Sequence, residues 1–142
     1  MEAAMACWLY QMSYPLYTHE LYRAEVWEGS LVMNWSIGEA TRRPTQVSLG
    51  DTVVLFYART DAHDPGIYGW GVIASFDGEV IHFRPAPPSD YLKMAPVPEE
   101  EVSGIIDSIR GQVPMGTMWE VDEEALARIR RKIAAHVYGI SL

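Results

Sequence analysis

Short apolar runs separated by polar turns dominate the chain, and most of these runs have the length and composition of β-strands. The clearest is "DTVVLFYAR", residues 51–59, which is rich in β-branched and aromatic residues and is apolar on both faces. A strand of this kind is typical of a barrel or of a sheet that is covered on both sides. The pattern predicts further strands at residues 6–12, 30–35, 67–76, 79–85 and 117–121.

Short turns connect three of these strands in sequence. A polar "TDAHDPG" loop follows residue 59, and Asp77-Gly78 is a pair typical of a tight hairpin turn. Because short turns reverse the chain direction, residues 51–59, 67–76 and 79–83 are predicted to form a continuous antiparallel meander.

Helical patterns occur in three places, at residues 16–26, 99–109 and 122–137. Pro98 and three glutamates suit the start of the second helix, and Asp122 suits the N-cap of the third. The third helix carries one apolar stripe, formed by Leu126, Ile129, Ile133 and Val137. The Pro-rich stretch between residues 86 and 98 is predicted to be a connection, too short to be an interdomain linker. The expected fold class is α+β: a small, mostly antiparallel β-barrel of about six strands with peripheral helices, in which residues 1–142 form a single domain.

Composition and charge narrow the function classes. The chain has 142 residues, of which 49% are hydrophobic and 21% charged, as is typical of a soluble globular protein. No apolar run is long enough to span a membrane and the start of the chain lacks the features of a signal peptide, so we expect a cytoplasmic protein without a membrane partner. A net charge of −8 disfavours non-specific coating of a polyanion. Arg42 and Arg43, close to Trp35 in sequence, still allow a local basic rim.

Few residues suggest catalysis or metal binding. Cys7 is the only cysteine, which excludes an internal disulfide and a multi-cysteine zinc site, and its apolar surroundings predict a buried, unreactive thiol. The "DAHD" segment, residues 61–64, has side chains that could ligate a metal, but a solvated turn closed by Pro65 and Gly66 is the favoured interpretation. No glycine-rich phosphate loop is present. We therefore expect no enzymatic activity, no metal and no cofactor.

The tryptophans are more informative. Trp35 ends a predicted strand and is followed by Ser36, Gly38 and two arginines, whereas Trp70 lies between two glycines that permit close approach of a backbone or a ligand. A flat aromatic face with small donors and arginines nearby is what binding of an unstacked base requires. The alternative for each tryptophan is a place in the core, and this is the prediction for Trp8.

The order of three segments resembles the EVE domain, a member of the PUA-like superfamily. "NWSIGE" is followed by "LGDTVVLFYAR" and then by "PGIYGWGVI", which match the family's tryptophan at the end of the second strand, its Gly-Asp pair and its "GI-x-G" segment. The resemblance implies a PUA-like barrel and recognition of a modified base in DNA or RNA. By similarity to the related YTH domains, Trp35 would be one wall of an aromatic cage, Ser36 would bond the base edge, and Ser13 would lie at the pocket floor. The relatives take a second wall from a long loop that the Asp77-Gly78 turn replaces here, which leaves Tyr14, Tyr57 or Tyr91 as candidates, or no second wall.

Together these observations predict a non-catalytic module that binds single-stranded or flipped-base nucleic acid. The predicted pocket consists of Ser13, Trp35, Ser36, Tyr57 and Trp70, and the predicted phosphate contacts are Arg42, Arg43 and Arg59. A hydrolase acting on a nucleotide or small amide, or a protein-interaction domain, are the alternatives. DNA versus RNA, the modification, the oligomeric state and a partnership with a nuclease stay open.

Overall fold

A computed structural model describes residues 6–12, 30–32, 48–58, 64–76, 80–87, 89–92, 94–111 and 118–139. The predicted helix at residues 16–26 and the predicted turn at Asp77-Gly78 lie outside these residues. The elements, in chain order, are β1 (Cys7–Met12), β2 (Ser30–Val32), β3 (Thr52–Tyr57), β4 (Gly66–Phe76), β5 (Val80–Pro85), α3 (Ser89–Leu92), β6 (Val97–Pro98), α4 (Glu99–Arg110), β7 (Met118–Val121) and α5 (Glu123–Tyr138).

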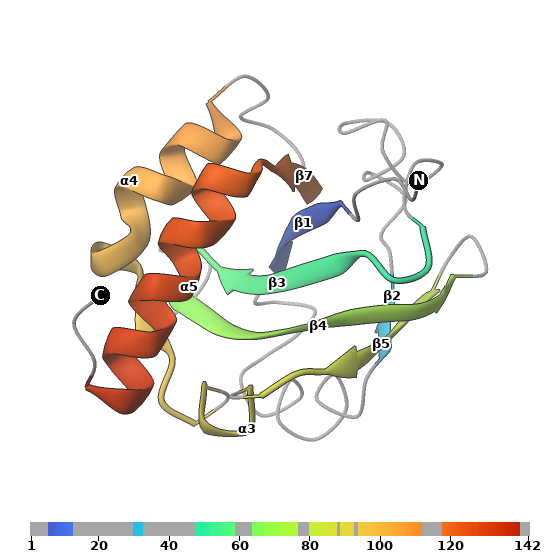
Figure 1. The fold of residues 1–142 in the computed structure, drawn as a ribbon, viewed down its shortest axis with the longest axis horizontal. Coiled ribbons are helices and arrows are strands. Elements are labelled where there is room, and N and C mark those ends of the chain that lie inside the picture. Colours follow the sequence, from blue (N-terminus) through green and yellow to red (C-terminus); the bar gives the residue numbers. More distant parts are fainter. Residues whose placement is uncertain are drawn as a thin grey trace.

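The strands form one mixed sheet, in the order β2-β5-β4-β3-β1-β7, with the short β6 paired to β4 (Figure 1). Antiparallel pairing of β3 with β4 and of β4 with β5 confirms the predicted meander. β1 runs parallel to β3, from the pair Cys7 and Thr52 to the pair Met12 and Tyr57. The sheet is therefore mostly antiparallel, with one parallel pair at its centre.

Closure of the predicted barrel is not confirmed. A closed barrel requires every strand to have a hydrogen-bonded neighbour on both sides. In the described part of the chain the pairing path ends at β2 on one side and at β7 on the other, and no pair joins these two strands. The architecture is thus an α+β sheet with helices on one side, and α5 crosses β3 and β4 (Figure 1).

The central strand β3 is buried on both faces, as its apolar sequence predicted. Val54 and Phe56 point into a core between the sheet and the helices α4 and α5, which we call the helix-side core. Val53, Leu55 and Tyr57 point into a second core on the opposite face, the far-side core. Alternate residues of a strand face opposite sides, so an apolar residue at every position requires a cover on each side.

The two long helices confirm their sequence signals. α4 has three glutamates in its first turn and buries Val102, Ile105 and Ile106. The Asp122 side chain caps α5 by accepting a hydrogen bond from the Ala125 backbone N–H at 2.8 Å. The helix ends at Gly139, whose φ of 67° is the left-handed conformation that favours glycine. None of the helices among the described residues is long and apolar enough to cross a membrane.

The Pro-rich connection contains two short elements that were not predicted, α3 and β6. Four and two residues are too few to produce a periodic pattern, so sequence periodicity cannot find them. β6 forms because β4 offers backbone partners to it, with Ile67 opposite Val97 and Gly66 opposite Pro98.

Gly104 offers a simple test of α4. It lies in the helix interior, where a Cβ atom would meet nothing within 4 Å. Glycine in an exposed helix interior is less favourable than alanine by about 0.5–1 kcal/mol. We expect Gly104→Ala to raise the free energy of unfolding by that amount in urea denaturation, and an unchanged or lower value would contradict the described helix.

Candidate functional site

Most of the predicted site lies outside the described residues. This holds for Ser13, Trp35, Ser36, Arg42, Arg43 and Arg59, and for Tyr14 as a candidate second wall. The structure does describe Tyr57 and Trp70, the other two residues of the predicted pocket, and Tyr91.

Tyr57 and Trp70 lie on opposite faces of the sheet. Tyr57 is fully buried in the far-side core, where its ring meets the Tyr68 ring edge-on at a centroid distance of 4.8 Å. Trp70 is paired with Val54 and packs against the helix-side core. The two residues therefore do not line one pocket, which corrects the prediction that groups them.

A β-bulge is the reason for this arrangement. Leu55 pairs with Gly69 and Phe56 with Ile67, so Tyr68 is an extra residue in β4. Without the bulge, Tyr68 and Trp70 would share a face, because they are two positions apart. The extra residue reverses the alternation and turns Trp70 toward the helices.

The Trp70 ring is held in place by the segment that follows β5. The Trp70 backbone N–H donates to the Ser89 hydroxyl at 2.9 Å, and that hydroxyl donates to the Trp70 carbonyl at 2.7 Å. The indole Nε1–H donates to the Pro87 carbonyl at 3.0 Å. The next position, Gly71, requires glycine, because a Cβ atom there would lie only 2.6 Å from the backbone carbonyl oxygen of Arg84. The close approach expected from the glycines is thus made by β5.

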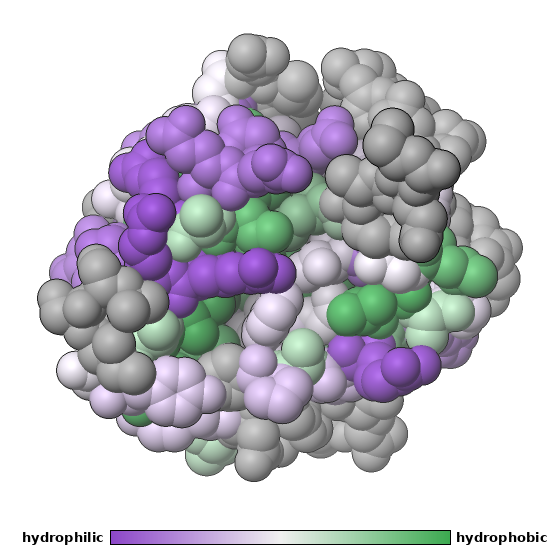
Figure 2. Space-filling model, in the orientation of Figure 1, coloured by the Kyte–Doolittle hydropathy of each residue, from purple (hydrophilic) through white to green (hydrophobic). Residues whose placement is uncertain are grey.

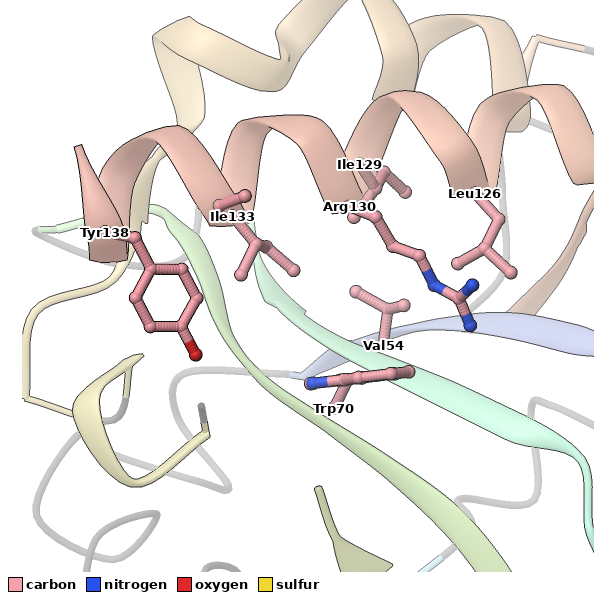
Figure 3. A pocket seen from close by; sticks show the side chains of 8 residues that line it. Val54, Trp70, Leu126, Ile129, Arg130, Ile133 and Tyr138 are labelled. Carbon is pink, nitrogen blue, oxygen red and sulfur yellow. The ribbon is translucent and has the colours of Figure 1, made fainter. Parts of the chain in front are cut away.

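A small apolar pocket lies between α5 and the sheet at this point (Figure 3). Its volume is about 160 Å³, and its lining consists of Val54, Trp70, Leu126, Ile129, Arg130, Ile133, Ala134 and Tyr138. Arg130 extends from α5 over the Trp70 ring, with its guanidinium carbon 5.3 Å from the ring centroid. This distance suits a cation–π contact. The described lining is mostly apolar, and its polar side chains are those of Trp70, Arg130 and Tyr138.

The family-like "LGD" segment has a structural role. Gly50 has a φ of 89°, which favours glycine, and the Asp51 side chain is buried. The Asp51 carboxylate accepts hydrogen bonds from Trp8 Nε1 at 3.0 Å, from the Ser48 N–H at 2.8 Å and from the Ala6 N–H at 3.2 Å. The burial predicted for Trp8 is confirmed. The Asp51 carboxylate accepts the hydrogen bond of the indole N–H, which is the only polar group of the Trp8 side chain.

The burial predicted for Cys7 is confirmed. Cys7 is buried in the helix-side core, and this burial raises the pKa of its thiol to about 12. The nucleophilic thiolate is therefore scarce at neutral pH. Among the described residues, no group of three or more His, Cys, Asp or Glu side chains could hold a metal ion, and of the "DAHD" segment only Asp64 is described.

One charged feature was missed in the sequence. Four exposed cations stand within five positions of α5, at Arg128, Arg130, Arg131 and Lys132, and we call them the α5 ridge. They are four of the 11 basic residues in the chain. Figure 2 shows hydrophilic side chains gathered over α4 and α5, beside an apolar hollow. The sequence signal is "RIRRK", residues 128–132, on a helix whose apolar stripe dominates its pattern.

Comparisons with known proteins show the fold. No protein-family model matches the sequence, and no curated protein matches it significantly. A hypothetical protein from Leishmania major has a similar structure, with a TM-score of 0.60 and 12% identity, covering 90% of this chain and 94% of that chain. A protein from Pseudomonas putida has a TM-score of 0.55 and 14% identity, covering 89% and 99%. Human THYN1, solved in complex with DNA containing 5-methylcytosine, has a TM-score of 0.55 and 10% identity, covering 87% and 95%. The chain therefore shares the overall fold of these proteins.

Proposed function

We propose that the protein is a non-catalytic nucleic-acid-binding module that takes one modified base into a pocket around Trp35. The observation that carries the proposal is the fold. It is shared, over 87% of this chain, with human THYN1, whose structure holds DNA containing 5-methylcytosine. A shared fold alone does not specify a ligand, so the proposal also uses the residues that follow the central strands.

The parallel pairing of β1 with β3 supports the position of the pocket. Its last pair is Met12 with Tyr57, so both strands leave the sheet at the same edge. Ser13 follows β1 directly in sequence, and Arg59 comes two residues after β3. A pocket with Ser13 at its floor and a phosphate contact from Arg59 would therefore begin at this edge.

The proposed pocket is smaller than the sequence suggested. Tyr57 is left out because it has no exposed surface on which a base could stack. Trp70 is left out because it packs on the helix side of the sheet. Trp35 is then the stacking surface, with Ser13 and Ser36 as polar contacts and Arg42, Arg43 and Arg59 as phosphate contacts.

The test compares oligonucleotides that carry one modified base with their plain counterparts, as DNA and as RNA, by fluorescence anisotropy. Trp35→Ala is expected to weaken binding of the preferred modified base by about 1–3 kcal/mol, the value of one base–aromatic stack. Trp70→Phe is the control, because a residue on the helix side should leave base preference unchanged. Circular dichroism establishes that both variants fold.

Two outcomes would sink the proposal. One is that no modified base binds better than its plain counterpart to the wild-type protein. The other is that Trp35→Ala folds normally and retains full base preference. Chemical turnover of the bound oligonucleotide by the wild type would contradict the non-catalytic part.

A further inference from the structure

A groove between α4 and α5 lies on the outer side of the helix pair, away from the Trp70 pocket. Its volume is about 370 Å³. α5 contributes Arg128, Arg131, Lys132 and Ala135, and α4 contributes Glu101, Gly104 and Ile105. Gly104 leaves the α4 side of the groove open, because it has no side chain and nothing occupies the space where a Cβ would stand. Three cations therefore border an accessible hollow.

The cations of this groove have no ionic partner among the described residues. The one ion pair found among the described residues lies outside the groove, where Arg110 pairs with Asp107 at 3.4 Å near the C-terminal end of α4. Glu101 lines the groove and Glu124 precedes Arg128 by four residues, but neither forms an ion pair with the ridge. The described lining thus holds three cations and one carboxylate, so the groove is net positive.

Stability does not account for this arrangement. Arg128 and Arg131 are three residues apart and Arg128 and Lys132 four, so like charges are neighbours on one helix face. Like charges at these spacings destabilise a helix. In a chain of net charge −8, such a cluster concentrates the attraction for an anion at one place. Arg130 differs from the other three, because it lies over Trp70 on the other flank of α5.

We propose that the α4–α5 groove binds the phosphodiester backbone of the nucleic acid, as a contact that is independent of base identity. This inference rests on the proposed function and adds a second surface to it. The two guanidinium groups present forked donors that match phosphate oxygens, and Lys132 adds a compact charge. The groove holds the strand, while the pocket around Trp35 discriminates between bases.

The experiment measures the salt dependence of binding to a plain duplex oligonucleotide. The double variant Arg128→Gln with Arg131→Gln removes two charges while keeping good helix formers. Arg84→Glu, at an exposed position on β5, is the charge-matched control, because each protein goes from −8 to −10. In the double variant alone, the plot of log affinity against log salt should become less steep, by about 2 units of slope. The ratio of the wild-type affinity to the double-variant affinity should then decrease about tenfold between about 50 and about 200 mM salt.

A second variant is expected to act in the opposite direction. Glu101→Gln removes the carboxylate that lines the groove, so it should strengthen binding of plain and modified oligonucleotides by the same factor. Stronger binding cannot arise from loss of folding. A result in which Glu101→Gln weakens binding would overturn the proposal.

The remaining outcomes separate this inference from the proposed function. If the wild type prefers a modified base but the double variant behaves like Arg84→Glu, the groove is not a phosphate site and the base pocket stands. If the wild type binds no oligonucleotide, both proposals fall. Binding of phosphatidylserine vesicles through Arg128 and Arg131, without binding of oligonucleotides, would also overturn the groove as a nucleic-acid contact.

Discussion

Replacing Asp51 by alanine is expected to lower the free energy of unfolding by about 3–5 kcal/mol, a large share of the stability of a small domain. The Asp51 side chain accepts hydrogen bonds from the Trp8 indole and from the backbone N–H groups of Ala6 and Ser48. Asp51 is only 2% exposed, so water cannot easily replace the carboxylate as the acceptor for these donors. Each buried donor left without an acceptor costs about 1–3 kcal/mol.

Urea denaturation measures this effect, with Asp122→Ala as the matched control. Asp122 is exposed and accepts one hydrogen bond, from Ala125 at the start of α5, so its loss should cost only about 1 kcal/mol. Trp8→Phe removes one of the three donors. In a double-mutant cycle it should therefore recover part of the loss caused by Asp51→Ala. A change below about 0.5 kcal/mol for Asp51→Ala would show that the carboxylate does not join β1 to β3.

Gly66→Ala is expected to destabilise the protein by at least about 3 kcal/mol, or to prevent folding. Gly66 has a φ of 154°, a conformation that side chains rarely adopt. A Cβ atom at this position would also overlap the carbonyl oxygen of Val97, which belongs to the paired strand β6. The clash is with backbone, so a rotamer change cannot relieve it.

The consequence should extend to α4, because the Glu99 N–H at its first residue donates to the Pro65 carbonyl at 3.0 Å. Separating β6 from β4 would break this contact as well. Circular dichroism and urea denaturation measure the loss, and Gly104→Ala, expected to act in the opposite direction, is the control. Wild-type stability in Gly66→Ala would mean that β6 does not pair with β4 as described.

These two predictions explain why a family resemblance could be seen in the sequence. The Gly-Asp pair and the "GI-x-G" segment carried it, and both have structural roles here. Gly50 supplies a positive φ, Asp51 satisfies buried donors, and Gly66 permits the approach of β6. Residues of this kind specify a fold, because few other residues meet their steric and polar requirements. They say little about a ligand, which depends on residues such as Trp35 and Ser13.

The sequence by itself determined most of the regular elements. The doubly apolar β3 required a sheet covered on both sides, and the short turns around β4 required an antiparallel meander. The cap and the apolar stripe of α5 required a helix over that sheet. These features are local, because strand alternation, turn chemistry and helix capping each act within a few residues.

Only the tertiary structure decided which faces and residues meet. The bulge at Tyr68 turned Trp70 away from Tyr57, and a one-residue shift of this kind leaves no mark on the apolar pattern. β1 pairs with β3 in parallel, which the long stretch of chain between them permits, and alternation within a strand does not encode direction. The charge of the α4–α5 groove depends on packing between two helices that are distant in sequence from the predicted site. Long-range contacts determine such surfaces, so Tyr57 and Trp70, which the sequence analysis grouped in one pocket, lie on opposite faces of the sheet.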